Sequence, residues 1–188
     1  QEFQKIAPTI FMGVDYNDFM GSFEKNMQTL GTIFGKEKEI DQELETIRNA
    51  VADLKQKASA SNEKALIVLS NDNKVSAYGP KSRFGLIHDV FGLPAVDQHI
   101  KASKHGQSIS FEYIVEKNPD YLFVIDRSAV VTKKASARQT IENELVKKTK
   151  AYQNGKIVYL DANVWYLSGG GLQSVSKMIN EIDKSINQ

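Results

Sequence analysis

Two stretches in the N-terminal third of the chain carry hydrophobic residues at helical spacing. The first pattern predicts a helix that begins after Asp15 and ends at Gly35. The second predicts a longer helix from about Lys36 to Ala58, with acidic residues early and lysines late, an order that suits the helix dipole. The apolar positions are Phe19, Phe23, Met27, Leu30 and Phe34 in the first helix and Ile40, Leu44, Ile47, Val51 and Leu54 in the second.

The longer helix has two interpretations. A helix of about twenty residues spans roughly 30 Å, which is enough for a rigid connector between two lobes. An ordinary amphipathic packing helix would show the same pattern. On the first interpretation, residues 1–35 belong to one lobe, residues 36–60 form the connector and residues 61–188 form a second lobe.

Strands and helices alternate after the long helix. Strand patterns cover residues 64–70, 75–78, 121–125 and 155–160, and helix patterns cover residues 84–91, 108–117, 139–148 and the residues from Leu172 onward. This alternation predicts an α/β fold with a mainly parallel sheet covered by helices on both faces. We expect Ile6–Val14 to be a strand of another domain, Ser110 to be a helix N-cap and the segment from Ser128 to Arg138 to be a mobile loop.

Composition and charge exclude several classes of protein. The 24 basic and 23 acidic side chains nearly cancel, so no overall field favours nucleic acid or an anionic membrane. The absence of cysteine excludes disulfide scaffolds, thiolate metal sites and cysteine nucleophiles. The apolar runs are too short to cross a bilayer. The chain opens at Gln1 with no signal peptide or lipid-attachment cysteine, and we expect it to be a piece of a longer protein.

The stretch from Val75 to Gly92 places a cation at the end of a strand. The strand breaks at Gly79-Pro80, and Arg83 follows before an amphipathic segment. Open α/β sheets hold ligands at the carboxyl ends of their strands. A polar connection whose arginine is simply solvated is the alternative.

A second arginine follows another strand. Arg127 comes directly after the strand that ends near Asp126, so it can converge with Arg83 at the same edge of a parallel sheet. Two guanidinium groups that face one cleft repel each other unless an anionic ligand neutralises them. The pair therefore predicts an anion site, whereas each arginine taken singly is also explained by a surface salt bridge.

His105 and Tyr166 are candidate iron donors. An imidazole and a phenolate together suit ferric iron, although singly His105 reads as a hydrogen-bonding residue and Tyr166, beside Trp165, as a packing residue. His88 and His99 have no partner at ligand spacing and are interpreted as structural.

The run Gly169–Gly171 could offer backbone amides to an anion or could simply allow a tight entry into the last helix. No nucleophile elbow or useful pair of carboxylates indicates catalysis, so we expect a protein that is not an enzyme.

Three blocks of sequence, in this order, carry a resemblance to a known family: SAYGPKSRFGLIHDVFG, KHGQSISFEYIVEKNPDYLFVIDR and IVYLDANVWYLSGGG. They resemble the substrate-binding proteins of iron-siderophore ABC importers, and most of all the catecholate and petrobactin receptors. The resemblance implies the C-terminal lobe of a two-lobed fold hinged by a single long helix. It also implies that most of the N-terminal lobe lies before Gln1.

The resemblance assigns roles to individual residues. Arg83 and Arg127 match two of the arginines that surround an anionic ferric catecholate, and Trp165 adjoins them as a further ligand-binding candidate. His105 and Tyr166 match positions that complete the iron coordination in some relatives. Glu112 matches a surface glutamate that docks onto the permease, although an acid favoured by the dipole at a helix start is the alternative.

The implied function is delivery of a ferric siderophore, of the catecholate type and with petrobactin as one option, to a membrane ABC permease. The resemblance implies no permanent cofactor, no nucleic-acid partner and an extracytoplasmic location, either as a membrane-anchored lipoprotein or in the periplasm. A lobe on its own could dimerise through its exposed lobe interface. The alternatives are a haem or cobalamin cargo and a nucleotide-binding α/β enzyme, which would need a phosphate loop or a catalytic pair.

Overall fold

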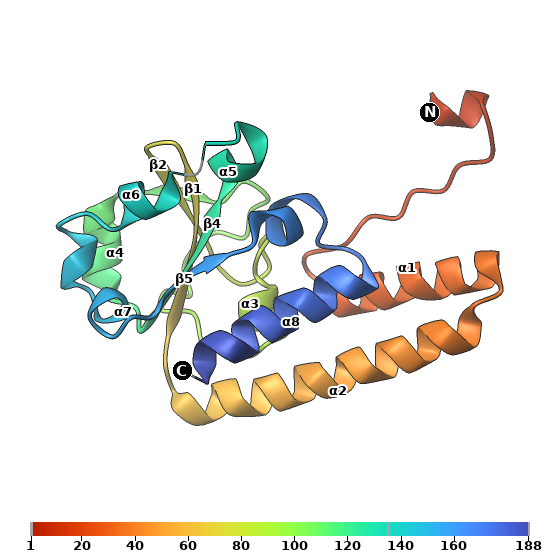
Figure 1. Ribbon diagram of the computed structural model, residues 1–188, viewed down its shortest axis with the longest axis horizontal. Coiled ribbons are helices and arrows are strands. Elements are labelled where there is room, and N and C mark those ends of the chain that lie inside the picture. Colours follow the sequence, from red (N-terminus) through yellow and green to blue (C-terminus); the bar gives the residue numbers. More distant parts are fainter. Residues whose placement is uncertain (1, 135, 188) are drawn as a thin grey trace.

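A five-stranded sheet lies between two layers of helices in the computed structural model, which describes residues 2–134 and 136–187 (Figure 1). The strand order is β3-β2-β1-β4-β5. The strands are β1 (Ala65–Asn71), β2 (Lys74–Tyr78), β3 (Gln107–Ile109), β4 (Tyr121–Asp126) and β5 (Ile157–Leu160). The α/β class predicted from the alternating pattern is therefore confirmed.

Four of the five strands point in one direction. β1 pairs with β4, and β4 with β5, in parallel, whereas β2 is antiparallel to both β1 and β3. The reversal follows from a two-residue hairpin turn, in which Asp72 adopts a positive φ of 52° that this short connection requires. The mainly parallel sheet is thus confirmed, with β2 as the exception.

Each face of the sheet has its own hydrophobic core. On β1, Ala65, Ile67 and Leu69 pack into one core, while Leu66 and Val68 pack into the other. The first core is covered by α1 (Phe19–Phe34), α2 (Glu37–Ser61), α3 (Leu86–Asp89) and α8 (Leu172–Ile186). The second is covered by α4 (Phe111–Lys117), α6 (Ala137–Ile141) and α7 (Lys150–Gln153). Figure 1 shows these two layers on opposite sides of the strands.

The helices α1 and α2 form an antiparallel pair that reaches beyond the sheet (Figure 1). Asp18 caps α1 by accepting a hydrogen bond from the Gly21 N–H at 3.1 Å, and Gly35 ends the helix in the left-handed region with φ 61°. α2 packs on α8 through its buried apolar stripe. Both helices occupy the ranges that the periodicity predicted.

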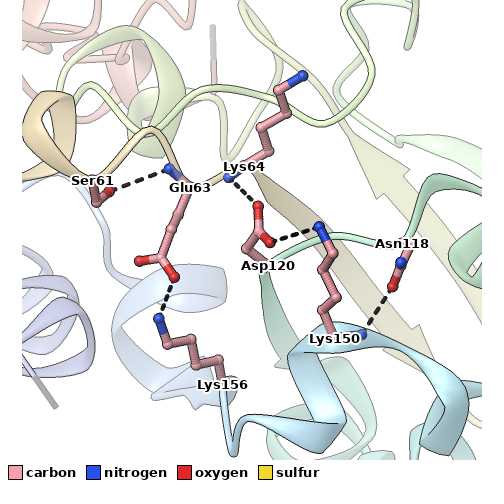
Figure 2. Close-up of polar contacts among 7 residues, drawn as sticks. All are labelled: Ser61, Glu63, Lys64, Asn118, Asp120, Lys150 and Lys156. Atoms are coloured by element: carbon pink, nitrogen blue, oxygen red, sulfur yellow. Dashed lines mark hydrogen bonds and ion pairs between the residues drawn. The ribbon is translucent and has the colours of Figure 1, made fainter.

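Polar contacts fix the junction between α2 and β1 to neighbouring strands and helices (Figure 2). The Lys64 N–H donates to Asp120 Oδ2 at 2.9 Å, which ties the start of β1 to the residue before β4. Glu63 pairs with Lys156, the residue before β5, and Lys150 reaches Asp120 from α7 at 3.4 Å. The long helix and the sheet are consequently joined by a cross-linked segment rather than by a loose linker.

Several local predictions are wrong. The segment Ile6–Val14, within the described range, forms no strand and leaves Phe11 95% exposed. A strand needs a neighbour for its backbone groups, and no described strand lies beside this segment. The only described regular element before α1 is the 3₁₀ turn Phe3–Lys5.

The other differences concern short helices. The segment predicted as a mobile loop begins with α5 (Arg127–Val131), because the Asp126 side chain accepts a hydrogen bond from the Ala129 N–H and caps a new helix. The helix predicted over 139–148 is divided into α6 and the 3₁₀ turn Val146–Lys148. The helix predicted over 84–91 is only α3. The helix expected after its N-cap Ser110 is α4, which Ser110 caps as predicted, whereas the short strand β3 before it was not predicted.

Truncation of Leu54 tests how far the fold depends on the long helix. Leu54 is 1% exposed on the face of α2 that joins the first core, so Leu54→Ala should lower the free energy of unfolding by about 2–5 kcal/mol. The exposed neighbour Asp53 offers a control, because Asp53→Ala should change the free energy of unfolding by less than about 0.5 kcal/mol. Urea unfolding followed by circular dichroism measures both values, and equal effects would contradict the packing described.

Candidate ligand-binding site

A pocket of about 200 Å³ opens where the loop after β2 meets the segment between β5 and α8. Its walls also include residues at and before the start of α1. The residues that matter for its chemistry are Arg83, Phe84, Trp165, Tyr166, Gly169 and Met178. Charged, aromatic and backbone groups thus meet in one hollow.

Arg83 is placed by the tight turn that follows β2. The Ser82 hydroxyl donates to the Gly79 carbonyl at 2.5 Å, and the Lys81 N–H donates to Asp89 Oδ2 at 2.6 Å. The guanidinium of Arg83 then donates through Nη2 to the Tyr166 carbonyl at 2.5 Å. Its carbon atom Cζ lies 4.2 Å from the centre of the Tyr166 ring, which is a cation–π contact.

Arg127 reaches the same tyrosine from the start of α5. Its Nε donates to the Tyr166 hydroxyl at 2.8 Å, and its Nη1 donates to Asn71 Oδ1 at 2.8 Å. Asn71 ends β1 and Arg127 follows β4, and these two strands are parallel neighbours. The structure therefore brings the two arginines together at Tyr166, but not for the reason expected from parallel strand ends. Because β2 is antiparallel to β1, its carboxyl end lies at the edge opposite that of β4, and the loop after β2 carries Arg83 to Tyr166.

Tyr166 lies in the field of both arginines. Burial raises the pKa of its hydroxyl, but the hydrogen bond and charge of Arg127, joined by those of Arg83, outweigh burial and lower the pKa from its ordinary value. Nearby Tyr78 shows the opposite balance, because burial raises its pKa to about 12. Tyr166 is thus a phenol that its surroundings prepare for the charged form.

Trp165 belongs to the hydrophobic core beside the pocket. It is 3% exposed, and its indole Nε1–H donates to Glu181 Oε2 on α8 at 2.8 Å. Its ring still forms part of the pocket wall. Trp165 consequently contacts the site by its apolar surface and the scaffold by its polar atom.

His105 does not join this cluster. It is exposed in the loop before β3, and its backbone N–H donates to Ser103 Oγ at 3.1 Å. The same loop touches the site, because the Arg83 N–H donates to the Ser103 carbonyl at 3.4 Å. In residues 2–134 and 136–187, no three His, Asp or Glu side chains gather closely enough to hold a metal ion by themselves.

The two remaining candidates lie at helix starts. Glu112 is exposed in the first turn of α4, where hydrogen bonds from its own backbone N–H and from Ser110 lower the pKa of its carboxyl. Gly169 and Gly170 line the pocket, and a Cβ on Gly169 would lie 2.9 Å from Met178 Cε. The glycines therefore allow a close approach of the chain to α8.

Sequence reasoning missed two contributors. Asn71 carries the same signal as Arg127, since it also stands at the carboxyl end of a strand in the sheet. Glu181 carries no such signal, because only the packing of α8 against the segment after β5 brings it to Trp165. His88 is structural as expected, with Nδ1 at 2.8 Å from the Leu93 carbonyl.

None of the helices that the structure describes has the length and apolar character that a membrane span requires.

Comparison with known proteins gives consistent matches. Residues 1–164 match the family model described as periplasmic binding protein. The chain is 50% identical over its whole length to the petrobactin-binding protein YclQ of Bacillus subtilis and 34% identical, over 98% of its length, to the ferric-anguibactin-binding protein FatB of Vibrio anguillarum. It spans 59% of the length of each of these relatives.

Solved structures agree with the sequence matches. The crystal structure of YclQ superposes with a TM-score of 0.98, and the match covers all of this chain and 66% of YclQ. The catecholate-siderophore binding protein VctP of Vibrio cholerae superposes with a TM-score of 0.92 at 36% identity, over 97% of this chain and 66% of VctP. The chain belongs to the periplasmic binding protein family, and the relatives named here are siderophore-binding proteins.

Proposed function

We propose that this chain is the part of a receptor that binds a ferric siderophore of the catecholate type, with petrobactin as the first candidate, for delivery to a membrane ABC permease. The observation that carries this proposal is the convergence of Arg83 and Arg127 on Tyr166, where Arg83 and Tyr166 line the pocket and Arg127 contacts it through the Tyr166 hydroxyl. The siderophores bound by the relatives YclQ, FatB and VctP support this class of ligand. The protein acts by binding and carries its iron as cargo rather than as a resident cofactor.

The chemistry of the arginine pair favours an anionic, aromatic ligand. A tris-catecholate ferric complex carries a net charge of about −3, so two partly buried guanidinium groups attract and orient it. The partly exposed ring of Tyr166, which lines the pocket beside Arg83, suits a catechol ring. Neither nucleic acid nor an enzyme substrate is needed to explain this arrangement.

We assign the parts of the chain to a two-lobed receptor. Residues 1–35 belong to the first lobe, residues 36–60 are the connector helix and residues 61–188 are the second lobe. The extension of α1 and α2 beyond the sheet and the match to 66% of the YclQ structure support this division (Figure 1). The ligand then lies between the pocket described here and the opposite lobe.

Charge removal at the two arginines tests the binding function. Arg83→Gln and Arg127→Gln should each weaken binding of ferric petrobactin roughly 10- to 150-fold, because each removes charge-assisted hydrogen bonds to the anion. Trp165 is the only tryptophan in the chain, so quenching of its fluorescence measures the affinity.

The matched control is Arg138→Gln, whose side chain is 72% exposed and pairs with Glu142 on the other layer. It should bind like the unchanged chain. Unaltered affinity in both site variants would contradict the proposal, and preferential binding of haem, seen as a Soret band, would replace the siderophore with another cargo.

Tyr166 and His105 supply donors to siderophore-held iron when the siderophore offers fewer than six. The lowered pKa of Tyr166 favours the phenolate that binds ferric iron, and the exposed loop of His105 leaves its imidazole accessible. This assignment requires the phenol to exchange its hydrogen bond with Arg127 for the metal.

The visible spectrum tests that assignment. With the ferric complex of a bis-catecholate ligand, which leaves two coordination sites open, Tyr166→Phe and His105→Ala should each shift the charge-transfer band of the bound complex. With a hexadentate tris-catecholate complex the same variants should leave the band unchanged, which provides the control. Identical spectra for all proteins with both ligands would exclude iron coordination by these residues.

The receptor is proposed to act outside the cytoplasm, as an anchored lipoprotein or in the periplasm.

Glu112 is the proposed contact with the permease. The Glu112 carboxylate is exposed and held in the charged form at the start of α4. An exposed acid on a rigid helix can pair with a basic pocket on a partner.

Transport measurements test this contact in a receptor that contains the chain. Glu112→Ala should leave ferric siderophore affinity unchanged but reduce cellular iron uptake several-fold, since a charge at an interface rim acts mainly on association. Glu116→Ala removes another exposed acid from the same helix and should have little effect. Equal uptake in the two variants would argue against docking through Glu112.

A further inference from the structure

One carboxylate on α8 holds the segment that carries Tyr166. Glu181 Oε2 accepts the indole N–H of Trp165 at 2.8 Å, and Glu181 Oε1 accepts the backbone N–H of Asp161 at 2.9 Å. Asp161 follows β5, and Trp165 lies four residues later in the π-helical turn Asn163–Leu167. Glu181 therefore accepts hydrogen bonds from both the beginning and the middle of the segment from Asp161 to Leu167.

Asp161 is the point from which that segment is built. Its carbonyl accepts the N–H groups of Val164 at 3.0 Å and Trp165 at 2.9 Å, and its carboxylate accepts the Asn163 N–H at 2.9 Å. A shift of Asp161 relative to α8 would thus move the whole turn. The hydrogen bond that the Asp161 N–H donates to Glu181 Oε1 opposes such a shift.

The position of the turn determines where Tyr166 meets the arginines. Tyr166 follows Trp165 directly, and its carbonyl and hydroxyl accept from Arg83 and Arg127. Because the indole of Trp165 is anchored towards α8, the rotation of the turn about its own axis is set. The positions of the Tyr166 carbonyl and ring follow from that rotation.

The charge on Glu181 is costly in this place. Burial raises the pKa of its carboxyl above the ordinary value, and nearby Asp161 acts in the same direction, whereas the two N–H donors oppose them. A carboxylate accepts both donors at once through separate oxygens, while a neutral amide of the same length offers a single acceptor oxygen. The ionised form of Glu181 is therefore the one that accepts both hydrogen bonds, from the Asp161 N–H and from the Trp165 indole.

We propose that Glu181 is a positioning residue for the ligand site, whose carboxylate holds the segment from Asp161 to Leu167 so that Tyr166 keeps Arg83 and Arg127 at a fixed separation. The consequence for siderophore affinity rests on the function proposed above. The consequence for the arginine–tyrosine geometry does not depend on it.

The test compares Glu181→Gln with a matched control on the same helix. Asp183→Asn also removes one negative charge from α8, but the Asp183 carboxylate pairs with Lys57 of α2 instead of with the turn. Thermal unfolding first establishes that both variants fold. If Glu181→Gln does not fold, Trp165→Phe removes the same indole hydrogen bond from its donor side and takes its place.

The first measurement needs no ligand. The titration of Tyr166, obtained as the ultraviolet difference between each protein and its Tyr166→Phe counterpart, should shift to higher pH in Glu181→Gln, because Arg127 and Arg83 no longer stabilise the phenolate fully. It should be unchanged in Asp183→Asn. A titration of Glu181→Gln identical to that of the control would overturn the proposal.

The second measurement uses ferric petrobactin. Glu181→Gln should weaken binding roughly three- to tenfold, and the loss should largely vanish in an Arg127→Gln background, since the two residues act on the same contact. Because these variants keep Trp165, its quenching reports the affinity. Fully additive effects would show a merely structural role and overturn the proposal. If the unchanged chain fails to bind ferric petrobactin, the proposed function fails, whereas the tyrosine titration still decides the role of Glu181.

Discussion

The geometry of the site depends on one interaction, in which two positively charged arginines contact the same tyrosine. Arg83 and Arg127 come from different loops, and each makes a hydrogen bond to Tyr166 through a different atom. Placing two guanidinium groups beside one pocket costs electrostatic and desolvation energy. The carbonyl, ring and hydroxyl of Tyr166 offset part of that cost, and the anionic ligand proposed above would complete the neutralisation.

The scaffold around this cluster is built to resist movement. The first core fastens α2 and α8 to one face of the sheet, and the polar contacts at the junction after α2 fasten the helix to the starts of β4 and β5 (Figure 2). Glu181 extends the same rigidity from α8 to the tyrosine. Preorganised charges bind more tightly because little ordering remains to be done when the ligand arrives.

The relatives give this half-site its context. The chain matches YclQ along its whole length but spans 59% of it, and the receptors in this comparison are named for siderophores of different chemistry. The class of ligand proposed for this chain rests on these relatives and on the arginine–tyrosine cluster.

The fold class, the two long helices, the positions of four of the five strands and the candidates Arg83, Arg127 and Tyr166 could be predicted from the sequence, because periodicity and strand ends are local features of the chain. The short strand β3 was not predicted. Prediction from the sequence also failed at residues 6–14, at α5 and at Glu181. These three features depend on contacts that form only in the folded chain. A strand requires a partner strand, and a helix cap depends on the geometry of the backbone that it faces. Glu181 lies twenty residues from Asp161 along the chain, so their contact is not visible in the sequence. Contacts between distant segments leave no periodic pattern, and here they set the geometry of the site.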